Sequence, residues 1–218
     1  GKLPFQPPSF SIFIEYLKAG IPIGIIIVLS NLEFRFDTLV IKNFIGSKAT
    51  GLYQSVYIII SAGLLIPNAF TASFYPNISK EKDSKDLLNV TIKYSMVLTS
   101  IALIGGIIGL FLTESILQLI YGKIDSQQIL AMKILLFTLI PIFFSSPYIF
   151  YFYSRNRQKQ VLWIVIIKTF LNMALNLYLI PLTGTIATAA FVMLSVEFIS
   201  ASLFFIKFLV KFKEYENI

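Results

Sequence analysis

Three ionisable side chains lie close together in an apolar stretch near the start of the chain. Glu33, Arg35 and Asp37 follow a long run of isoleucine, valine and leucine residues. Glu33 and Asp37 are four residues apart and share one face of a helix, whereas Arg35 lies about 200° around the helix from Glu33. Each charge would cost roughly 2.5 to 3.5 kcal/mol at the centre of a bilayer, so the three need a wet or paired environment. The alternative is that they lie at the outer end of a span and reach the interface.

A second polar stripe runs along a later apolar segment. Lys168, Asn172 and Asn176 are spaced by four, so they line one narrow face of a helix. Asparagines in membrane spans often form hydrogen bonds between helices. The stripe is either such an interhelical contact or the wall of a polar cavity.

Glu197 is the single acid of the last apolar segment. A carboxylate in lipid either takes up a proton or pairs with a cation. We expect the partner to be a cation such as Arg35 or Lys168, and Glu197 is a candidate coupling carboxylate.

Hydroxyl and amide side chains share one face of another segment, at Tyr53, Tyr57, Ser61 and Asn68. Tyrosines in membrane proteins are usually anchors at the interface, so these residues carry little weight as site residues.

Whole classes of chemistry are excluded by residue types that the sequence lacks. The chain has no cysteine and no histidine, which excludes thiolate nucleophiles, Cys/His metal sites and Ser-His-Asp triads. We find no catalytic constellation and no metal-ligand spacing. The sequence therefore predicts a protein that is not an enzyme and that has no cofactor.

The composition indicates that much of the surface faces lipid. Of the 218 residues, 56% are hydrophobic and only 13% are charged, whereas soluble domains carry about a quarter charged residues. A span needs about 20 apolar residues, and runs without charge mark where the spans lie. We expect an all-α polytopic integral membrane protein, a bundle of six transmembrane helices at residues 12–41, 51–76, 87–112, 130–153, 161–181 and 185–209.

The ends and the orientation follow from the polar segments. Residues 1–11 are rich in proline and read as a linker, residues 12–209 as the helical lobe and residues 210–218 as a cytoplasmic tail. Positive residues gather on the cytoplasmic side of membrane proteins. One side of the predicted bundle has only Lys42, Lys48 and Lys123, and the other has eleven basic residues. Both termini are therefore expected to be cytoplasmic, with the basic charge serving topology rather than nucleic-acid binding.

Several short motifs, in order, resemble the polysaccharide (O-antigen type) flippases of the multidrug, oligosaccharidyl-lipid and polysaccharide exporter superfamily. They are Arg35-Phe36-Asp37 after Ile21-Pro22, Gly51-Leu52-Tyr53, Pro67 with Phe74-Tyr75-Pro76, Tyr121-Gly122, the asparagine-bearing segment 172–181 that ends in Leu-Ile-Pro, and Gly184 with Ala187 to Ala190. The family usually has a second glycine before its alanine pair, where this chain has Ile186.

The resemblance implies a fold and a function. The matching motifs belong to the second of two lobes, so the chain resembles a carboxy-terminal half whose partner is an amino-terminal lobe of the same or another chain. Such proteins move a lipid-linked, diphosphate-bearing saccharide across the cytoplasmic membrane by alternating access. By this resemblance, Arg35 and Lys168 bind the diphosphate or an anionic sugar, and Asn172 and Asn176 bind sugar hydroxyls. Asp37, beside Glu33 in the cavity, orients Arg35 or responds to the ion gradient.

Other functions stay open at this point. A cation-coupled multidrug efflux transporter needs acidic groups in its cavity, which Glu33, Asp37 and Glu197 would supply. Arg35 and Lys168 argue against that function. A membrane scaffold subunit without transport activity is the third possibility.

Overall fold

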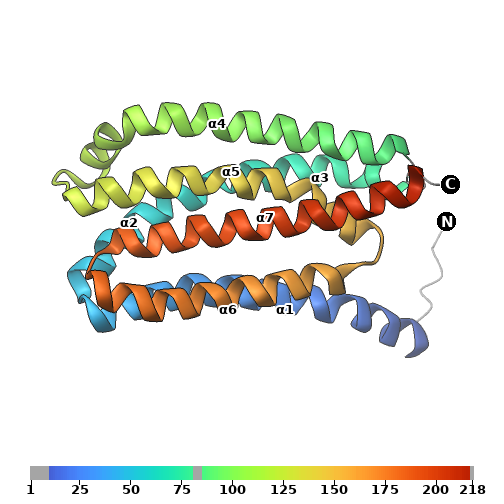
Figure 1. Cartoon of the computed structure of the whole chain (residues 1–218), viewed down its shortest axis with the longest axis horizontal. Coiled ribbons are helices and arrows are strands. Elements are labelled where there is room, and N and C mark those ends of the chain that lie inside the picture. The colour runs from blue at the N-terminus through green and yellow to red at the C-terminus, as the bar shows by residue number, and fades with distance from the viewer. Residues whose placement is uncertain (1–9, 81–84, 217–218) are drawn as a thin grey trace, which may run out of the picture.

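The computed structural model describes residues 10–80 and 85–216, and within them it consists of α-helices joined by short turns. Figure 1 shows these helices running along the long axis of the molecule. In chain order the helices are α1 (Phe10–Phe44), α2 (Ser47–Gly63), α3 (Leu65–Lys80), α4 (Lys85–Tyr121), α5 (Ser126–Ser154), α6 (Gln158–Thr183) and α7 (Ile186–Glu216).

The prediction of an all-α polytopic bundle is confirmed. Within the described residues, six helical stretches are long and apolar enough to cross a membrane, and each overlaps one of the six predicted spans. Local signals explain where the helices end. Asp125 caps α5 by accepting a hydrogen bond from the Gln127 amide at 3.0 Å, and Gly184 ends α6 in the left-handed conformation with φ 64°.

The second predicted span consists of two helices rather than one. Pro67 has no backbone N–H, so the carbonyl of Gly63 has no helical donor four residues later. The amide of Leu64 instead bonds to the carbonyl of Ser61 at 3.1 Å, which tightens the last turn of α2. The helix therefore breaks at Leu64, in the middle of the span, and α3 begins at the next residue.

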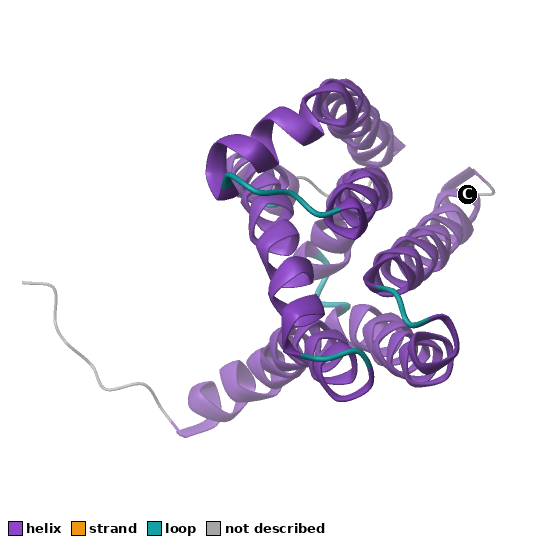
Figure 2. Ribbon diagram, turned by 90° about the vertical axis from the view of Figure 1, so that its left-hand side faces the viewer, coloured by secondary structure: helices purple, strands orange, loops and turns teal. Residues whose placement is uncertain are grey.

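The central helix of the bundle is α5. It packs against α7 and α4 along much of its length and also against α2 and α3, whereas α1 packs chiefly against α6. Pro147 interrupts the hydrogen bonding of α5, and the hydroxyl of Ser95 on α4 bonds to the nearby carbonyl of Phe144 at 2.8 Å. Side chains of neighbouring helices are the expected partners for backbone groups that a proline disturbs within a membrane. Figure 2 shows the bundle turned by 90°, with the helices seen nearly end on.

One end of the bundle carries most of the described basic residues. The first turn of α1, the last turn of α7 and the turn between α5 and α6 lie together at this end (Figure 1), which we call the basic end. Its described basic residues include Lys85, Arg155, Arg157, Lys159, Lys207 and Lys211.

The predicted domain limits differ slightly from the helices. Residues 1–9 of the predicted linker lie outside the described residues, and α1 already begins at Phe10. Most of the predicted tail is helical, because α7 continues to Glu216. Residues 217–218 lie outside the described part.

Candidate functional site

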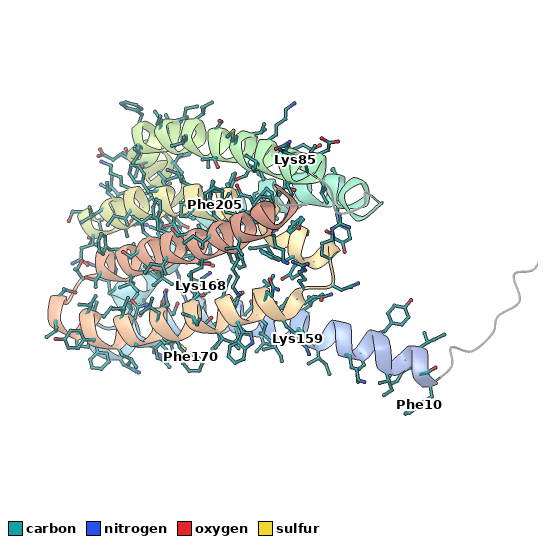
Figure 3. All side chains as sticks on the ribbon, turned by 45° about the vertical axis from the view of Figure 1, so that its right-hand side comes forward. Phe10, Lys85, Lys159, Lys168, Phe170 and Phe205 are labelled. Atoms are coloured by element: carbon teal, nitrogen blue, oxygen red, sulfur yellow. The ribbon has the colours of Figure 1, made fainter. Side chains whose placement is uncertain are left out.

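Three charged side chains from three helices meet in the middle of the bundle. The ammonium of Lys168 on α6 donates a hydrogen bond to Glu197 Oε1 on α7 and lies 3.4 Å from Glu33 Oε2 on α1. Their side chains are 15%, 9% and 8% exposed, respectively. Figure 3 shows Lys168 on α6, beside α7. We call Glu33, Lys168 and Glu197 the ion triad.

The ion triad lies deep within the predicted membrane layer. Lys168 is ten residues after the start of α6, which places it about 15 Å along a helix of 26 residues. Glu197 is eleven residues after the start of α7, which begins at the other end of the bundle. Both positions are too far from either end for simple snorkelling, so the charges stabilise one another where they lie.

A second polar group lies one helical turn beyond the triad. Asp37 is 1% exposed, and its Oδ1 accepts a hydrogen bond from Asn176 Nδ2 at 2.6 Å. Its Oδ2 accepts one from the hydroxyl of Tyr53 at 3.4 Å. The same amide of Asn176 also donates to Asn172 Oδ1 at 3.0 Å. We call Asp37, Tyr53, Asn172 and Asn176 the amide cluster.

The two polar stripes predicted from spacing therefore face each other. Glu33 and Asp37 share one face of α1, and Lys168, Asn172 and Asn176 share the face of α6 that packs against it. The spacing of four residues explains this arrangement, because such residues recur on one face of a helix. Of the predicted site residues, the structure brings these five and Glu197 together.

Arg35 is not part of either group. Its side chain is exposed and lies on the opposite side of α1 from Glu33 and Asp37. The expectation that Asp37 orients Arg35 therefore has no support in the contacts of the described residues. Of the two cations considered for Glu197, the structure selects Lys168.

A cavity of about 370 Å³ lies beside the ion triad. It is lined by Glu33, Asp37, Lys168 and Glu197, and by hydroxyl side chains that include Ser145, Ser146 and Ser200. On α1 the lining runs from Ile26 to Asp37, which is about 16 Å at 1.5 Å per residue. The neighbouring asparagines of α6 do not line it.

The cavity extends toward the basic end. Its lining reaches Tyr153 in the last turn of α5 and Val161 in the first turn of α6. Beyond Asp37 the opposite end is filled by a tightly packed cluster that includes Val40, Ile41 and Ala190. The cavity thus runs from the basic end to the level of the amide cluster.

The sequence did not predict several residues of this site, or assigned them another role. Tyr53 is fully buried and bonds to Asp37, and Tyr57 lines the cavity, so the expectation that these tyrosines are interfacial anchors is wrong. Ser145 and Ser146 lie in a run without charge and were not predicted to line a polar cavity. Their position between Pro141 and Pro147 was the available signal, because prolines in membrane helices often lie beside polar cavities.

The chemistry of the site does not resemble a metal centre. Among the residues that the structure describes, no group of three acidic, cysteine or histidine side chains is placed to hold a metal ion. Two of the three carboxylates instead share the ammonium of Lys168. The arrangement can exchange protons and small ions with the cavity.

Part of the chain is similar in sequence to a capsular polysaccharide biosynthesis protein. It is 27% identical to CapF of Staphylococcus aureus over 131 residues, which cover 59% of this chain and 33% of CapF. The aligned part therefore spans about a third of the length of that relative. No protein-family model matches the chain, and no solved structure matches it. Among the described residues, six helical stretches are long and apolar enough to cross a membrane, which fits a multi-pass membrane protein.

Proposed function

We propose that the chain is one lobe of a transporter that moves a lipid-linked, diphosphate-bearing oligosaccharide or polysaccharide precursor across the cytoplasmic membrane. Transport by alternating access would use a partner lobe, in the same or another chain. Two separate observations support this proposal. The membrane-buried site supports transport, and the similarity to CapF, whose name assigns it to capsular polysaccharide biosynthesis, supports a saccharide substrate.

The observation that carries the proposal is the ion triad at the wall of the cavity. Charged groups within membrane spans are costly, and they usually mark the path of a substrate, an ion or a proton. A helix bundle that served only as a scaffold would be more stable with apolar residues at these positions. A function that needs charge at this depth would account for the presence of Glu33, Lys168 and Glu197 in the middle of the bundle.

The charge balance of the site favours coupling to a cation gradient. Glu33, Asp37 and Glu197 carry three negative charges when ionised, and Lys168 supplies a single positive charge. Protons or a bound cation can balance the remaining charge in a region of low dielectric constant. Glu197 then acts as a coupling carboxylate, because it can exchange Lys168 for a proton supplied through the cavity.

The diphosphate is assigned to Arg35 rather than to Lys168. The ammonium of Lys168 is neutralised by two carboxylates, so it does not offer free charge to an anion. Arg35 is exposed on the far side of α1, and a guanidinium matches two phosphate oxygens. An exposed charge at this depth needs a polar surface beside it, and a partner lobe would provide one.

Cation-coupled drug efflux is the second candidate, and one observation favours it. The lining of the cavity holds more carboxylates than cations, which suits a positively charged substrate. The two functions make opposite predictions in proteoliposomes that contain the full protein. A flippase transfers a fluorescent lipid-diphosphate saccharide to the opposite leaflet and does not transport cationic dyes. An efflux transporter moves the dyes in response to a pH or sodium gradient and leaves the saccharide lipid in place.

A further inference from the structure

Buried polar atoms without a partner gather where α1 and α6 meet. Within the described residues, they include Thr169 Oγ1, Asn172 Nδ2 and Asn176 Oδ1. Both asparagine side chains are completely buried and absent from the cavity lining. A sugar could not reach them in this conformation, so the hydrogen bonding of Asn172 and Asn176 must serve something inside the protein. Unpaired buried polar atoms are rare enough in proteins to require an explanation.

Asp37 has only neutral hydrogen-bond partners. They are the amide of Asn176 and the hydroxyl of Tyr53. The charged groups nearest to it are Glu33, one turn away on the same helix, and Lys168 on α6. Because Lys168 is already bound by two carboxylates, it leaves Asp37 without a cation of its own. A buried carboxylate held only by neutral donors is strongly disfavoured in its charged form.

The remaining neighbours do not change this balance. Tyr57 of α2 lines the same cavity as Asp37, and its phenol supplies no positive charge. Glu197 of α7 adds negative charge on the far side of Lys168. On α5, the residues that line the shared cavity are apolar residues, serines and Tyr153. A proton on Asp37 is therefore the simplest way to neutralise it.

The geometry allows Asp37 to hold that proton as a donor. Asp37 Oδ1 and Asn176 Nδ2 lie 2.6 Å apart, and this separation also suits an O–H···O bond, which spans about 2.5–3.0 Å. A side-chain amide can turn over by 180°, which exchanges the positions of its nitrogen and oxygen. If Asn176 and Asn172 both turn over, the Asn176 oxygen accepts from protonated Asp37 and from Asn172 Nδ2.

We propose that Asn172 and Asn176 form a reversible hydrogen-bond chain that senses the proton on Asp37. When Asp37 is ionised, Asn176 donates to Asp37 and to Asn172. When a proton from the cavity forms an O–H bond on Asp37 Oδ1, the carboxyl becomes the donor and both amides reverse. The proton leaves a hydronium ion in the cavity, which becomes water. The hydrogen bonds among the three side chains break and form again with donor and acceptor exchanged, and the net charge of the cluster changes by one.

This chain would link proton uptake to helix packing. The protonated cluster is neutral, so it holds α1 against α6 at little electrostatic cost. The ionised cluster places a charge at the same interface and favours the entry of water between the two helices. Asn172 and Asn176 are positioning residues in this scheme, because they act through Asp37. The inference deepens the coupling part of the proposed function.

The test is an infrared pH titration of the purified chain in lipid nanodiscs without saccharide. The carbonyl stretching band of a protonated carboxyl that is present in the wild type and absent in Asp37→Asn is assigned to Asp37. Asn176→Leu removes a charge-assisted hydrogen bond from the ionised form and a weaker one from the protonated form. We therefore expect the midpoint of this band to move upward by about one pH unit, a tenfold gain in proton affinity. Asn172→Leu should move it in the same direction by less.

The reversal itself is read from asparagine labelled with carbon-13 in its side chain. The amide band that is lost in Asn176→Leu should shift with the same midpoint as the Asp37 band, and that shift should be absent in Asp37→Asn. Asn31→Leu, at an exposed asparagine of α1, is the matched control and should leave both bands unchanged.

Three results would overturn the inference. They are a midpoint that neither asparagine substitution moves, an amide shift that persists in Asp37→Asn, and an Asp37 band that sodium removes at constant pH. If Asn176→Leu does not fold, Asn172→Leu and the labelled wild-type chain decide the outcome. A failed saccharide transport assay would contradict the proposed function. It would not change the interpretation of this titration, which contains no saccharide.

Discussion

Lys168 and Glu197 form a hydrogen-bonded ion pair between α6 and α7, about two-fifths of the way along each helix. The same ammonium lies 3.4 Å from Glu33 of α1, so a single lysine joins three helices. This relationship links α1, α6 and α7 and places one positive and two negative groups at the cavity.

Removing the lysine should destabilise the protein strongly. Lys168→Met leaves Glu33 and Glu197 buried together without a cation, and breaking a buried pair costs about 3–5 kcal/mol. Adding Glu33→Gln and Glu197→Gln should restore most of that stability, because the uncompensated charges are gone. Thermal unfolding in detergent measures both effects.

The exposed pair between Lys133 and Glu114 provides a matched control. Its atoms lie 3.7 Å apart, and the side chains are 41% and 63% exposed. Lys133→Met should therefore cost less than about 1 kcal/mol. Equal losses for Lys168→Met and Lys133→Met would show that the ion triad does not stabilise the bundle.

Arg35 should matter for export and not for stability. Arg35→Gln removes an exposed charge, so its effect on unfolding should stay within about 0.5 kcal/mol. If Arg35 binds the diphosphate, surface polysaccharide in the native host should fall at least tenfold while the protein still inserts. Lys42→Gln, at another exposed cation of α1, should leave export unchanged. Normal polysaccharide in the Arg35→Gln strain would remove this residue from the substrate site.

Single cysteines can map the cavity without background, because the chain contains no cysteine. Ser145→Cys and Ser200→Cys lie in the cavity lining, whereas Ala189→Cys would lie in the packed cluster at the opposite end. A membrane-impermeant thiol reagent added on the cytoplasmic side should label the first two much faster than the third. Labelling of the serine positions only from the outside would mean that the assumed orientation is reversed.

Two glycines of α4 should respond differently to the same substitution. A Cβ at Gly109 would lie 2.8 Å from Leu136 Cδ2. A Cβ at Gly105 would have no described atom of another helix within 4 Å. Gly109→Leu should destabilise by about 1–3 kcal/mol through overpacking against α5. Gly105→Leu should be close to neutral. Equal unfolding temperatures for the two variants would contradict the close packing of α4 on α5.

Local spacing predicted the six spans and the two polar stripes, because both depend on residues near one another in the sequence. The sequence also offered two cations, Arg35 and Lys168, as possible partners of Glu197. The choice between Arg35 and Lys168 depends on how α1, α6 and α7 are rotated within the bundle, which no local pattern encodes.

Long-range contacts account for what could not be predicted. Asp37 and Asn176 are 139 residues apart, so their hydrogen bond appears only when α1 packs against α6. Tyr53 was read as an interfacial anchor because its sequence environment does not show that it turns toward Asp37. The break at Leu64 had a local cause in Pro67, although a proline inside an apolar run can bend a helix without breaking it.

The most direct test of the proposed function is Glu197→Gln on the chromosome of the native host, with lipid-linked saccharide measured in each leaflet. The substitution keeps the size of the side chain and removes its charge. We predict that surface polysaccharide falls at least tenfold and that the lipid-linked precursor accumulates in the cytoplasmic leaflet, while the amount of inserted protein is unchanged. Wild-type levels of surface polysaccharide and no accumulated precursor would contradict a role of the buried ion triad in moving the saccharide.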